Sequence, residues 1–287
     1  MQKKALLFVN SKKPDAVNLA EEIRDGLEKR DHSVEIFSTE NKTEKCNPKK
    51  PDISISLGGD GTVLFASRIM APMGTPVMPI NLGTLGFIAA VSPAQWEETF
   101  AQWESGKAVV SRRLMLDVSV ERDATCIFQS CALNDAVVSA AGIAKLVRLT
   151  LEAETASGDR IDLGHFRADG LIVATPTGST GYSVAAGGPI IDPEMDAVII
   201  NPICPFTLAS RPIVVPSGDR IITIVEKEQR SSIILTVDGQ ITCPLECNDR
   251  VIVRRCGFAL QLIASDRWAF YRALKTKLEW SGGHTRA

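Results

Sequence analysis

In the first hundred residues, short apolar runs alternate with segments in which apolar residues recur at helical spacing. Short apolar runs, typical of strands, occur at residues 4–9, 33–37, 52–57 and 75–80. Between them, apolar residues recur at the spacing of one helix face at residues 14–29, 63–70 and 93–104. Strands that alternate with helices predict an α/β domain built on an open sheet.

The pattern changes near Gly106. From residue 107 to residue 264 the chain consists mainly of short β-type runs, and turn signals such as those at 157–159 and 217–219 separate many of them. Such a pattern predicts a second, mainly antiparallel β domain. We therefore predict an α/β domain at residues 1–106 and a β-rich domain at residues 107–265.

Helical spacing returns in the last segment, at residues 266–280. A terminal helix with no partner would expose Trp268, Phe270, Leu274 and Leu278 to water. We expect this helix to return to the α/β domain, so residues 266–287 are assigned to that domain.

Composition and charge narrow the classes of function. Apolar residues make up 45% and charged residues 23% of the chain, as in globular proteins with a real core. The 32 Lys and Arg residues against 34 Asp and Glu residues give a net charge of −2, so no global basic field favours nucleic acid or a membrane surface. No apolar run is long enough to span a bilayer, and residues 1–10 suit a first strand better than a signal peptide.

The seven cysteines are scattered and lack the paired spacing of a zinc site. Several of them, Cys126, Cys131 and Cys256, lie inside apolar runs. This arrangement predicts buried, reduced thiols in a cytoplasmic protein. No residue is assigned as a metal ligand.

One glycine-rich stretch, residues 57–62, lies where a predicted strand ends and a predicted helix begins. Glycines at such a point let backbone N–H groups approach a phosphate, and the helix N-terminus adds partial positive charge. The carboxylate of Asp60 would repel a phosphate, so it fits better opposite a hydroxyl or a metal ion. The alternative is an ordinary tight turn, because Gly-Gly and Asp-Gly are common turn pairs.

A second glycine-bearing loop, residues 81–87, follows the strand predicted at 75–80. Two such loops at the ends of two strands of one unit can face the same crevice. The alternative is a plain connection plugged by Leu82, Leu85 and Phe87.

Hydroxyl side chains are concentrated in the segment Thr175–Ser183, which we call the hydroxyl loop. Four of them, with Gly178 and Gly181, fall within residues 177–183, after a predicted strand and before a short predicted helix. Hydroxyls and free N–H groups at a helix start suit a ribose or a phosphate. A capped helix would need only one hydroxyl, so the composition favours a binding loop.

Two adjacent polar residues, Asn134 and Asp135, interrupt an apolar run. Buried polar side chains are costly unless they meet a partner. Asn offers a donor and an acceptor and Asp two acceptors, a suitable set for a ribose diol or a base. A β-bulge or strand end with local hydrogen bonds is the alternative.

With these residues in view, the chain resembles the NAD kinase family. The resemblance extends over Gly-Gly-Asp-Gly-Thr at 58–62 and Thr-Pro-Thr-Gly-Ser-Thr at 175–180, and over residues 81–87, 133–135, 169–171, 181–188, 237–240 and 274–280. It implies an α/β nucleotide-binding domain at residues 1–106 followed by a β-sandwich-like, NAD-binding domain at residues 107–265, with a site between the two domains. The implied reaction is transfer of the γ-phosphate of ATP to the adenosine ribose 2′-hydroxyl of NAD. It also implies NAD and ATP as small-molecule partners, Mg²⁺ as the cation that accompanies ATP, and a homodimer or homotetramer.

The resemblance also implies roles for particular residues. Asp60 would be the catalytic base, with Gly61 beside the dinucleotide. The other residues that would contact the dinucleotide are Asn134, Asp135, Lys145, Arg167, Asp169, Thr180, Gly181, Tyr182, Ser183, Val184, Ala185 and Gln240. The chain departs from the family pattern at three positions: Asp135 replaces a frequent Glu, Gly181 a frequent Ala, and Thr84 a frequent Arg.

Two other classes of function remain open at this point. A lipid or sphingoid kinase that shares the glycine loop would need an apolar acceptor groove, which the hydroxyl loop does not favour. A non-catalytic dinucleotide sensor would bind NAD without forming NADP. A dehydrogenase is disfavoured, because no Gly-x-Gly-x-x-Gly follows the first predicted strand.

Overall fold

The computed structural model describes residues 2–39, 46, 48–83, 86–88, 91–142, 145–155, 157–207, 209–264, 266 and 268–278. The chain forms two compact units, Met1–Arg112 with Ala259–Ala287 and Arg113–Phe258, which we call the first and second units. Both boundaries fall inside long strands, so residues 107–112 and 259–264 cluster with the first unit.

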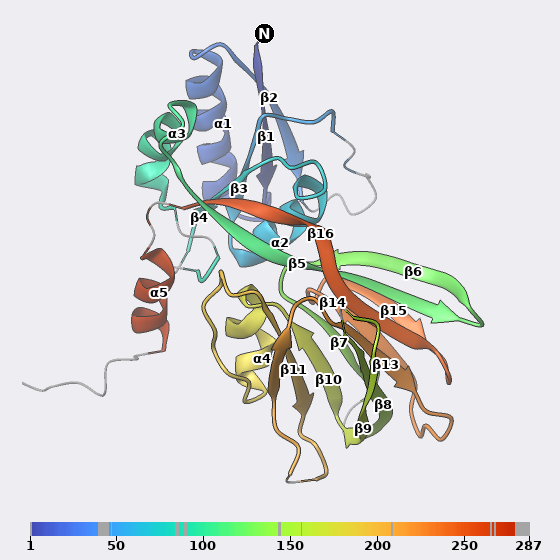
Figure 1. The fold of residues 1–287 in the computed structure, drawn as a ribbon. Helices are drawn as coiled ribbons and strands as arrows, with labels where there is room; N and C mark the ends of the chain where they lie inside the picture. The colour runs from blue at the N-terminus through green and yellow to red at the C-terminus, as the bar shows by residue number, and fades with distance from the viewer. Residues whose placement is uncertain are drawn as a thin grey trace, which may run out of the picture. The chain divides into compact units, whose positions relative to one another are not determined.

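The first unit is an α/β sheet domain, as the apolar pattern predicts (Figure 1). Its strands are β1 (Lys3–Val9), β2 (His32–Ser38), β3 (Ile53–Gly58) and β4 (Val77–Asn81). Its helices are α1 (Pro14–Glu28), α2 (Asp60–Met70), α3 (Trp96–Glu104), which a short 3₁₀ turn (Pro93–Gln95) precedes, and α5 (Ala269–Lys277). The strands pair in parallel in the order β2-β1-β3-β4, so all four carboxyl ends lie along one edge of the sheet.

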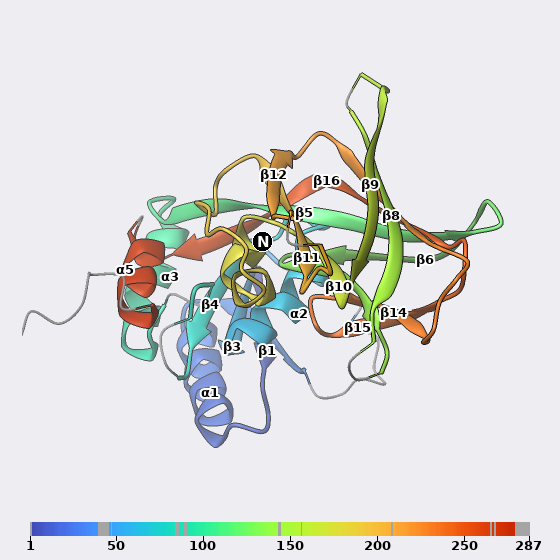
Figure 2. The same cartoon turned by 90° about the horizontal axis from the view of Figure 1, so that it is seen from below.

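Successive side chains of β1 point to opposite faces of this sheet and pack against the helices that cover those faces. Leu7 and Val9 belong to one apolar core with Ile23 of α1 and Phe100 of α3. Phe8, between them, faces the other way, and its ring lies 5.9 Å from the ring of Phe65 in α2. Helices α1 and α3 therefore cover one face and α2 the other (Figure 2).

The terminal helix α5 belongs to the first unit, as expected. The ring of Phe270 lies 6.2 Å from that of Phe87, and Lys277 Nζ lies 5.2 Å from the same ring. Packing on this unit does not cover the whole helix face, because Trp268 and Leu278 remain exposed. The expectation that docking would bury these two side chains is therefore wrong.

The second unit is built from antiparallel strands, which confirms the predicted fold class. The long strands β5 (Val109–Arg122) and β16 (Arg250–Ala264) continue into it from the first unit. The remaining strands are β6 (Thr125–Ala132), β7 (Asp135–Ala140), β8 (Val147–Glu154), β9 (Arg160–Ala168), β10 (Gly170–Ala174), β11 (Ala197–Ile203), β12 (Ile213–Pro216), β13 (Arg220–Val225), β14 (Ile233–Val237) and β15 (Ile241–Leu245). A 3₁₀ turn (Thr177–Thr180) and the short helix α4 (Tyr182–Ala185) follow β10.

Six of these strands form one sheet, in the order β12-β11-β10-β7-β14-β15, while β13, β8 and β9 extend from β16 in another. Side chains from both sheets share one apolar core, which includes Ala136 and Val138 of β7 and Leu149 of β8. Val137 faces the opposite way, into a small cluster that Ala186 joins. The six-stranded sheet thus has an inner face in the sandwich core and an outer face near α4.

The cysteine prediction is only partly confirmed. All seven cysteines are free of disulfide bonds. Cys256 is buried, but Cys126 is exposed on β6 and Cys131 is half-buried, because β6 pairs only with β5 and turns one side to water. No helix in the described part of the chain is long and apolar enough to cross a membrane.

Candidate functional site

The glycine loop of the first unit is shaped by contacts that only glycine permits. A Cβ on Gly58, the last residue of β3, would lie 2.2 Å from Thr62 Oγ1. Gly59 then caps α2 in an extended conformation, and its carbonyl accepts a hydrogen bond from Thr62 N at 3.0 Å. Asp60 therefore begins α2 at the carboxyl edge of the sheet, half-buried.

The second glycine-bearing loop returns to the same carboxylate. A Cβ on Gly86 would lie 2.2 Å from Asp60 Oδ1, so the backbone of Gly86 packs directly against that side chain. The sequence left open whether the two glycine loops lie together, and in the structure they meet at Asp60. Thr84, where the family often has Arg, and Leu85 lie outside the described residues.

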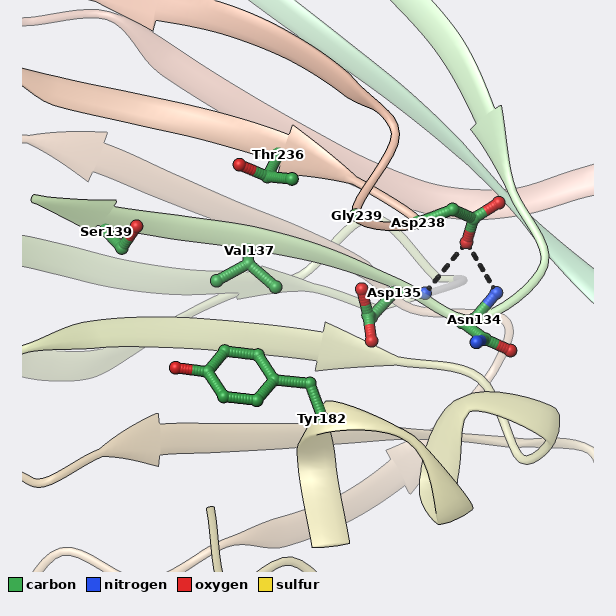
Figure 3. A pocket seen from close by; sticks show the side chains of 8 residues that line it. All are labelled: Asn134, Asp135, Val137, Ser139, Tyr182, Thr236, Asp238 and Gly239. Atoms are coloured by element: carbon green, nitrogen blue, oxygen red, sulfur yellow. Dashed lines mark hydrogen bonds between the residues drawn. The ribbon is translucent and has the colours of Figure 1, made fainter. Parts of the chain in front are cut away.

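In the second unit, Asn134 and Asp135 lie where β6 ends and β7 begins. The carboxylate of Asp238 accepts hydrogen bonds from three successive backbone N–H groups at this point, those of Leu133 at 3.1 Å, Asn134 at 2.7 Å and Asp135 at 3.2 Å. Figure 3 shows the bonds from Asn134 and Asp135. Asp238 is buried, and it fixes this turn although it lies 103 to 105 positions away in the sequence. β6 and β7 are therefore two strands joined by a polar junction.

The hydroxyl loop holds this junction from the other side. Thr175 donates a hydrogen bond from Oγ1 to Leu133 O at 2.5 Å, and its N donates to Asn134 O at 2.8 Å. A Cβ on Gly178 would lie 2.1 Å from Asn134 O. Two segments that are distant in the sequence, the turn with Asp238 and the hydroxyl loop, therefore converge on the backbone of Asn134.

Most hydroxyls of this loop bond within the fold, which differs from the composition argument. Ser179 Oγ donates to Ile191 O at 3.3 Å, Thr180 Oγ1 donates to Thr177 O at 3.3 Å, and Ser183 Oγ accepts from Asn201 Nδ2 at 3.3 Å. The structural alternative accounts for these three. Thr177 Oγ1 and Asn134 Oδ1 are buried and have no hydrogen-bond partner among the described residues, which suits groups that a ligand satisfies.

A pocket of about 380 Å³ opens beside this junction, on the outer face of the six-stranded sheet. Its lining residues are Asn134, Asp135, Val137, Ser139, Tyr182, Thr236, Asp238 and Gly239 (Figure 3). Sequence analysis selected Asn134, Asp135 and Tyr182 but missed the others. The two-residue period of β7 could have suggested Val137 and Ser139, since they share a face with Asp135.

Burial makes Asp135 a weaker acid than an ordinary aspartate. The side chain is 5% exposed. Loss of solvation, together with the smaller effect of the nearby charge of Asp238, raises the pKa of Asp135 to about 7. The pocket therefore contains a carboxyl group that changes charge near neutral pH.

The remaining predicted residues lie in other places. Lys145 and Arg167 line a separate pocket of about 310 Å³ together with Leu146, Arg148, Glu228 and Arg230. Asp169 is exposed between β9 and β10, and Gln240 is exposed after the turn that carries Asp238. Gly61 is exposed on α2 of the first unit.

Residues of the short helix and its approach lie close to the pocket. A Cβ on Gly181 would lie 3.6 Å from Asn134 Nδ2 and 3.2 Å from Gly178 O. Ser183 is buried, whereas Val184 is half-buried and Ala185 exposed. Gly181 and Tyr182 therefore form the part of α4 and its approach that lies nearest to Asn134 and the pocket.

Comparisons with known proteins agree over both units. The ATP-NAD kinase N-terminal domain family matches residues 8–108, and the ATP-NAD kinase C-terminal domain family matches residues 133–265. An NAD kinase of Treponema denticola is 41% identical over 282 residues, which cover 98% of this chain and 97% of that protein. An NAD kinase of Geotalea daltonii is 36% identical over 97% of this chain and 99% of its own length.

Two solved structures share the fold. A yeast NADH kinase complexed with NADH superposes with a TM-score of 0.83 at 20% identity and covers 99% of this chain and 89% of its own. An NAD kinase from Archaeoglobus fulgidus in complex with ATP has a TM-score of 0.72 at 27% identity, and covers 96% of this chain and 98% of its own.

Proposed function

Since this chain belongs to the NAD kinase family, we propose which of its residues bind NAD and which act in the transfer of phosphate from ATP. The chain is an NAD kinase, and a lipid kinase or a non-catalytic sensor is not favoured. The observation that supports these roles is the convergence of two distant segments on Asn134, beside a pocket that Asp135 and Tyr182 line. Incubation of the purified protein with NAD, ATP and Mg²⁺, with NADP measured enzymatically, tests the activity, and absence of NADP would contradict it.

In the proposed reaction, the 2′-oxygen of the adenosine ribose of NAD attacks the γ-phosphorus of ATP. A new O–P bond forms, the bond from the γ-phosphorus to the β,γ-bridging oxygen breaks, and ADP leaves. Asp60 orients the hydroxyl and accepts its proton late. Because phosphoryl transfer is largely dissociative, positioning and charge neutralisation supply most of the acceleration, and a strong base is not required.

We assign binding of the dinucleotide to the pocket of the second unit. Asn134 offers an unpartnered Oδ1 and Asp135 two carboxylate oxygens, which match the donors of a ribose or an amide. The Tyr182 ring offers a face for stacking. The remaining predicted contacts stay proposals for the same ligand: Gly61, Lys145, Arg167, Asp169, Thr180, Gly181, Ser183, Val184, Ala185 and Gln240.

The cation that accompanies ATP is proposed to be Mg²⁺. No cluster of three or more His, Cys, Asp or Glu side chains that could hold a metal exists among the described residues. This fits Mg²⁺, which is commonly held by phosphate oxygens, water and one or two carboxylates rather than by a protein cage. Asp60 is the carboxylate we propose beside it, and the ion would neutralise charge on the phosphates.

We further propose a cytoplasmic homodimer or homotetramer. The cysteines support a reducing compartment, because all seven are free. Arg167 and Asp169 support an oligomer, since neither lines the pocket of Asn134 within one copy of the chain. Sedimentation of the purified protein tests this, and a monomer at assay concentration would contradict it.

The acidity of Asp135 leads to a prediction about pH. Above about pH 7 the carboxylate accepts hydrogen bonds from the ligand, whereas below it the group is protonated and must lose its proton before it can accept them. As the pH falls from 8 to 6, the KM for NAD is expected to rise by up to about tenfold, with a smaller change in kcat at saturating NAD. Steady-state kinetics at constant ionic strength measures both.

Asp135→Asn provides the control, because an amide does not titrate in this range. Its KM for NAD is expected to be higher at pH 8 and independent of pH between 6 and 8. If the wild-type profile persists in this variant, another group controls binding.

A second prediction concerns the contact between Gly86 and Asp60. In Gly86→Ala the new Cβ would overlap Asp60 Oδ1 and push the carboxylate out of position. We expect kcat to fall about 10- to 100-fold, the typical cost of moving a catalytic group by about 1 Å. The thermal midpoint should change little, since the side chain can rotate.

The control is Gly257→Ala in β16, outside the proposed site. A Cβ there has no atom within 4 Å. Its kcat should stay within about threefold of the wild type. Equal losses in both variants would show that a general effect on the fold, and not the position of Asp60, decides the rate.

A further inference from the structure

The strand order of the first unit marks one crevice at its carboxyl edge. From β1 the chain runs through α1 on one face to β2, and from β3 it runs through α2 on the other face to β4. The order β2-β1-β3-β4 therefore changes direction between β1 and β3. Ligands of open α/β sheets bind outside the carboxyl ends of the strands at such a point. The loops after β1 and β3 flank this point, and the second of them carries Asp60.

The loop after β1 carries Lys13 at the start of α1. Backbone bonds fix it, since Lys13 N donates to Asn10 O at 3.1 Å and Asn10 N donates to Leu57 O at 3.1 Å. Lys13 is half-buried, whereas the adjacent Lys12 is exposed. The chain thus holds one of two neighbouring lysines against the end of the sheet.

The ammonium of Lys13 lies over Gly83, in the loop after β4. A Cβ on Gly83 would lie 3.9 Å from Lys13 Nζ and 3.8 Å from Asn81 Oδ1, which accepts a hydrogen bond from Gly83 N at 3.1 Å. Lys13 makes no ion pair with a carboxylate in the described part of the chain, so its charge stays available to a ligand. Glycine at 83 leaves the space above the peptide open.

Gly83 and Gly86 connect this cation to the proposed base. They are three positions apart in the sequence, so their Cα atoms lie at most about 11 Å apart. Gly83 lies beside the Lys13 ammonium and Gly86 against the Asp60 carboxylate. One short loop therefore carries both contacts.

Transfer of phosphate from ATP needs positive charge close to the phosphates. Phosphoryl transfer spreads negative charge over the transferred group and the leaving phosphate, and lysine is a compact cation that binds phosphate well. The residues proposed for the first unit, Asp60 and Gly61, carry no positive charge. The N-terminus of the 15-residue helix α1, which Lys13 caps, adds partial positive charge in the same place.

From this geometry we propose that Lys13 binds the terminal phosphates of ATP over Gly83 and holds them for transfer near Asp60. The inference rests on the proposed role of Asp60 and adds a phosphate-binding residue to it.

The test replaces Lys13 by Met, which keeps the length and apolar stem of the side chain and removes its charge. A lost charge-assisted contact to phosphate predicts a KM for ATP about 10- to 100-fold higher in Lys13→Met, with the KM for NAD within about twofold. Lys13→Arg should restore most of the affinity for ATP. Lys12→Met is the matched control and should bind ATP like the wild type, because Lys12 is exposed.

Calorimetry with inorganic tripolyphosphate makes the test independent of turnover. The wild type and Lys12→Met should bind this probe, and Lys13→Met should bind it at least about tenfold more weakly. Equal binding by all variants, or a rise in the KM for NAD as large as that for ATP, would overturn the proposal. A wild type that binds the probe through Lys13 but makes no NADP would support Lys13 and contradict the proposed function instead.

Discussion

Asp60→Asn is expected to reduce kcat at least about a hundredfold while leaving NAD binding and the fold intact. The amide keeps the size of the side chain, so its contact with Gly86 is preserved. It cannot accept the proton of the ribose hydroxyl as a carboxylate does, and it no longer supplies negative charge to a cation on the phosphates. Rate measurements at saturating ATP and NAD, with NAD affinity from calorimetry, separate turnover from binding.

Asp15→Asn is a suitable control for this variant. Asp15 lies in the first turn of α1 as Asp60 lies in the first turn of α2, so both changes remove an acidic side chain from a helix N-terminus. The loss of that favourable charge costs about 0.3–1 kcal/mol in either case. Only Asp60→Asn should lose activity. Near-normal turnover of Asp60→Asn would remove Asp60 from the role of base.

The parts of the site that the sequence predicted are those set by local chemistry. Gly58 and Gly59 stand between an apolar run and a helical stripe, so a strand end followed directly by a helix that begins at Asp60 could be predicted from spacing alone. Asn134 and Asp135 stood out because polar residues inside an apolar run need partners. Their partner could not be inferred in the same way.

Contacts that depend on strand order lay beyond the sequence. Asp238 reaches the backbone of Asn134 because β14 pairs with β7, a pairing between residues about a hundred positions apart. Lys13 meets Gly83 because β1 and β4 lie on either side of β3, which periodicity does not reveal. In both cases the role of the residue depends on a neighbour that is close in space and distant in the sequence.

Composition does not show in which direction a hydroxyl points. The hydroxyls of Ser179 and Thr180 looked like ligand groups, but both bond to backbone carbonyls of the fold. A count of hydroxyls cannot distinguish side chains that face a ligand from side chains that hold a turn, because Ser and Thr do both with the same atoms. The loop is therefore important first as the support of Asn134.

Gly178→Ala tests that support and is expected to have a large effect on stability as well as on activity. The new Cβ would lie 2.1 Å from Asn134 O and 2.6 Å from Asn134 C, and these backbone atoms cannot turn away as a side chain can. Overpacking of this kind costs about 3 kcal/mol or more. The thermal midpoint should fall by about 6 to 12 °C. In the folded fraction, kcat/KM for NAD should fall about a hundredfold, because Asn134 is displaced from the pocket.

Gly257→Ala is the control, since a Cβ at that strand position of β16 has no atom within 4 Å. Its thermal midpoint and its kcat/KM for NAD should stay near those of the wild type. Restoring stability in Gly178→Ala with a ligand separates the two effects: saturating ATP should stabilise the variant as it does the wild type, whereas NAD should stabilise it far less. If NAD protects both proteins equally, the junction at Asn134 does not bind the dinucleotide, and the assignment of the pocket in the second unit is wrong.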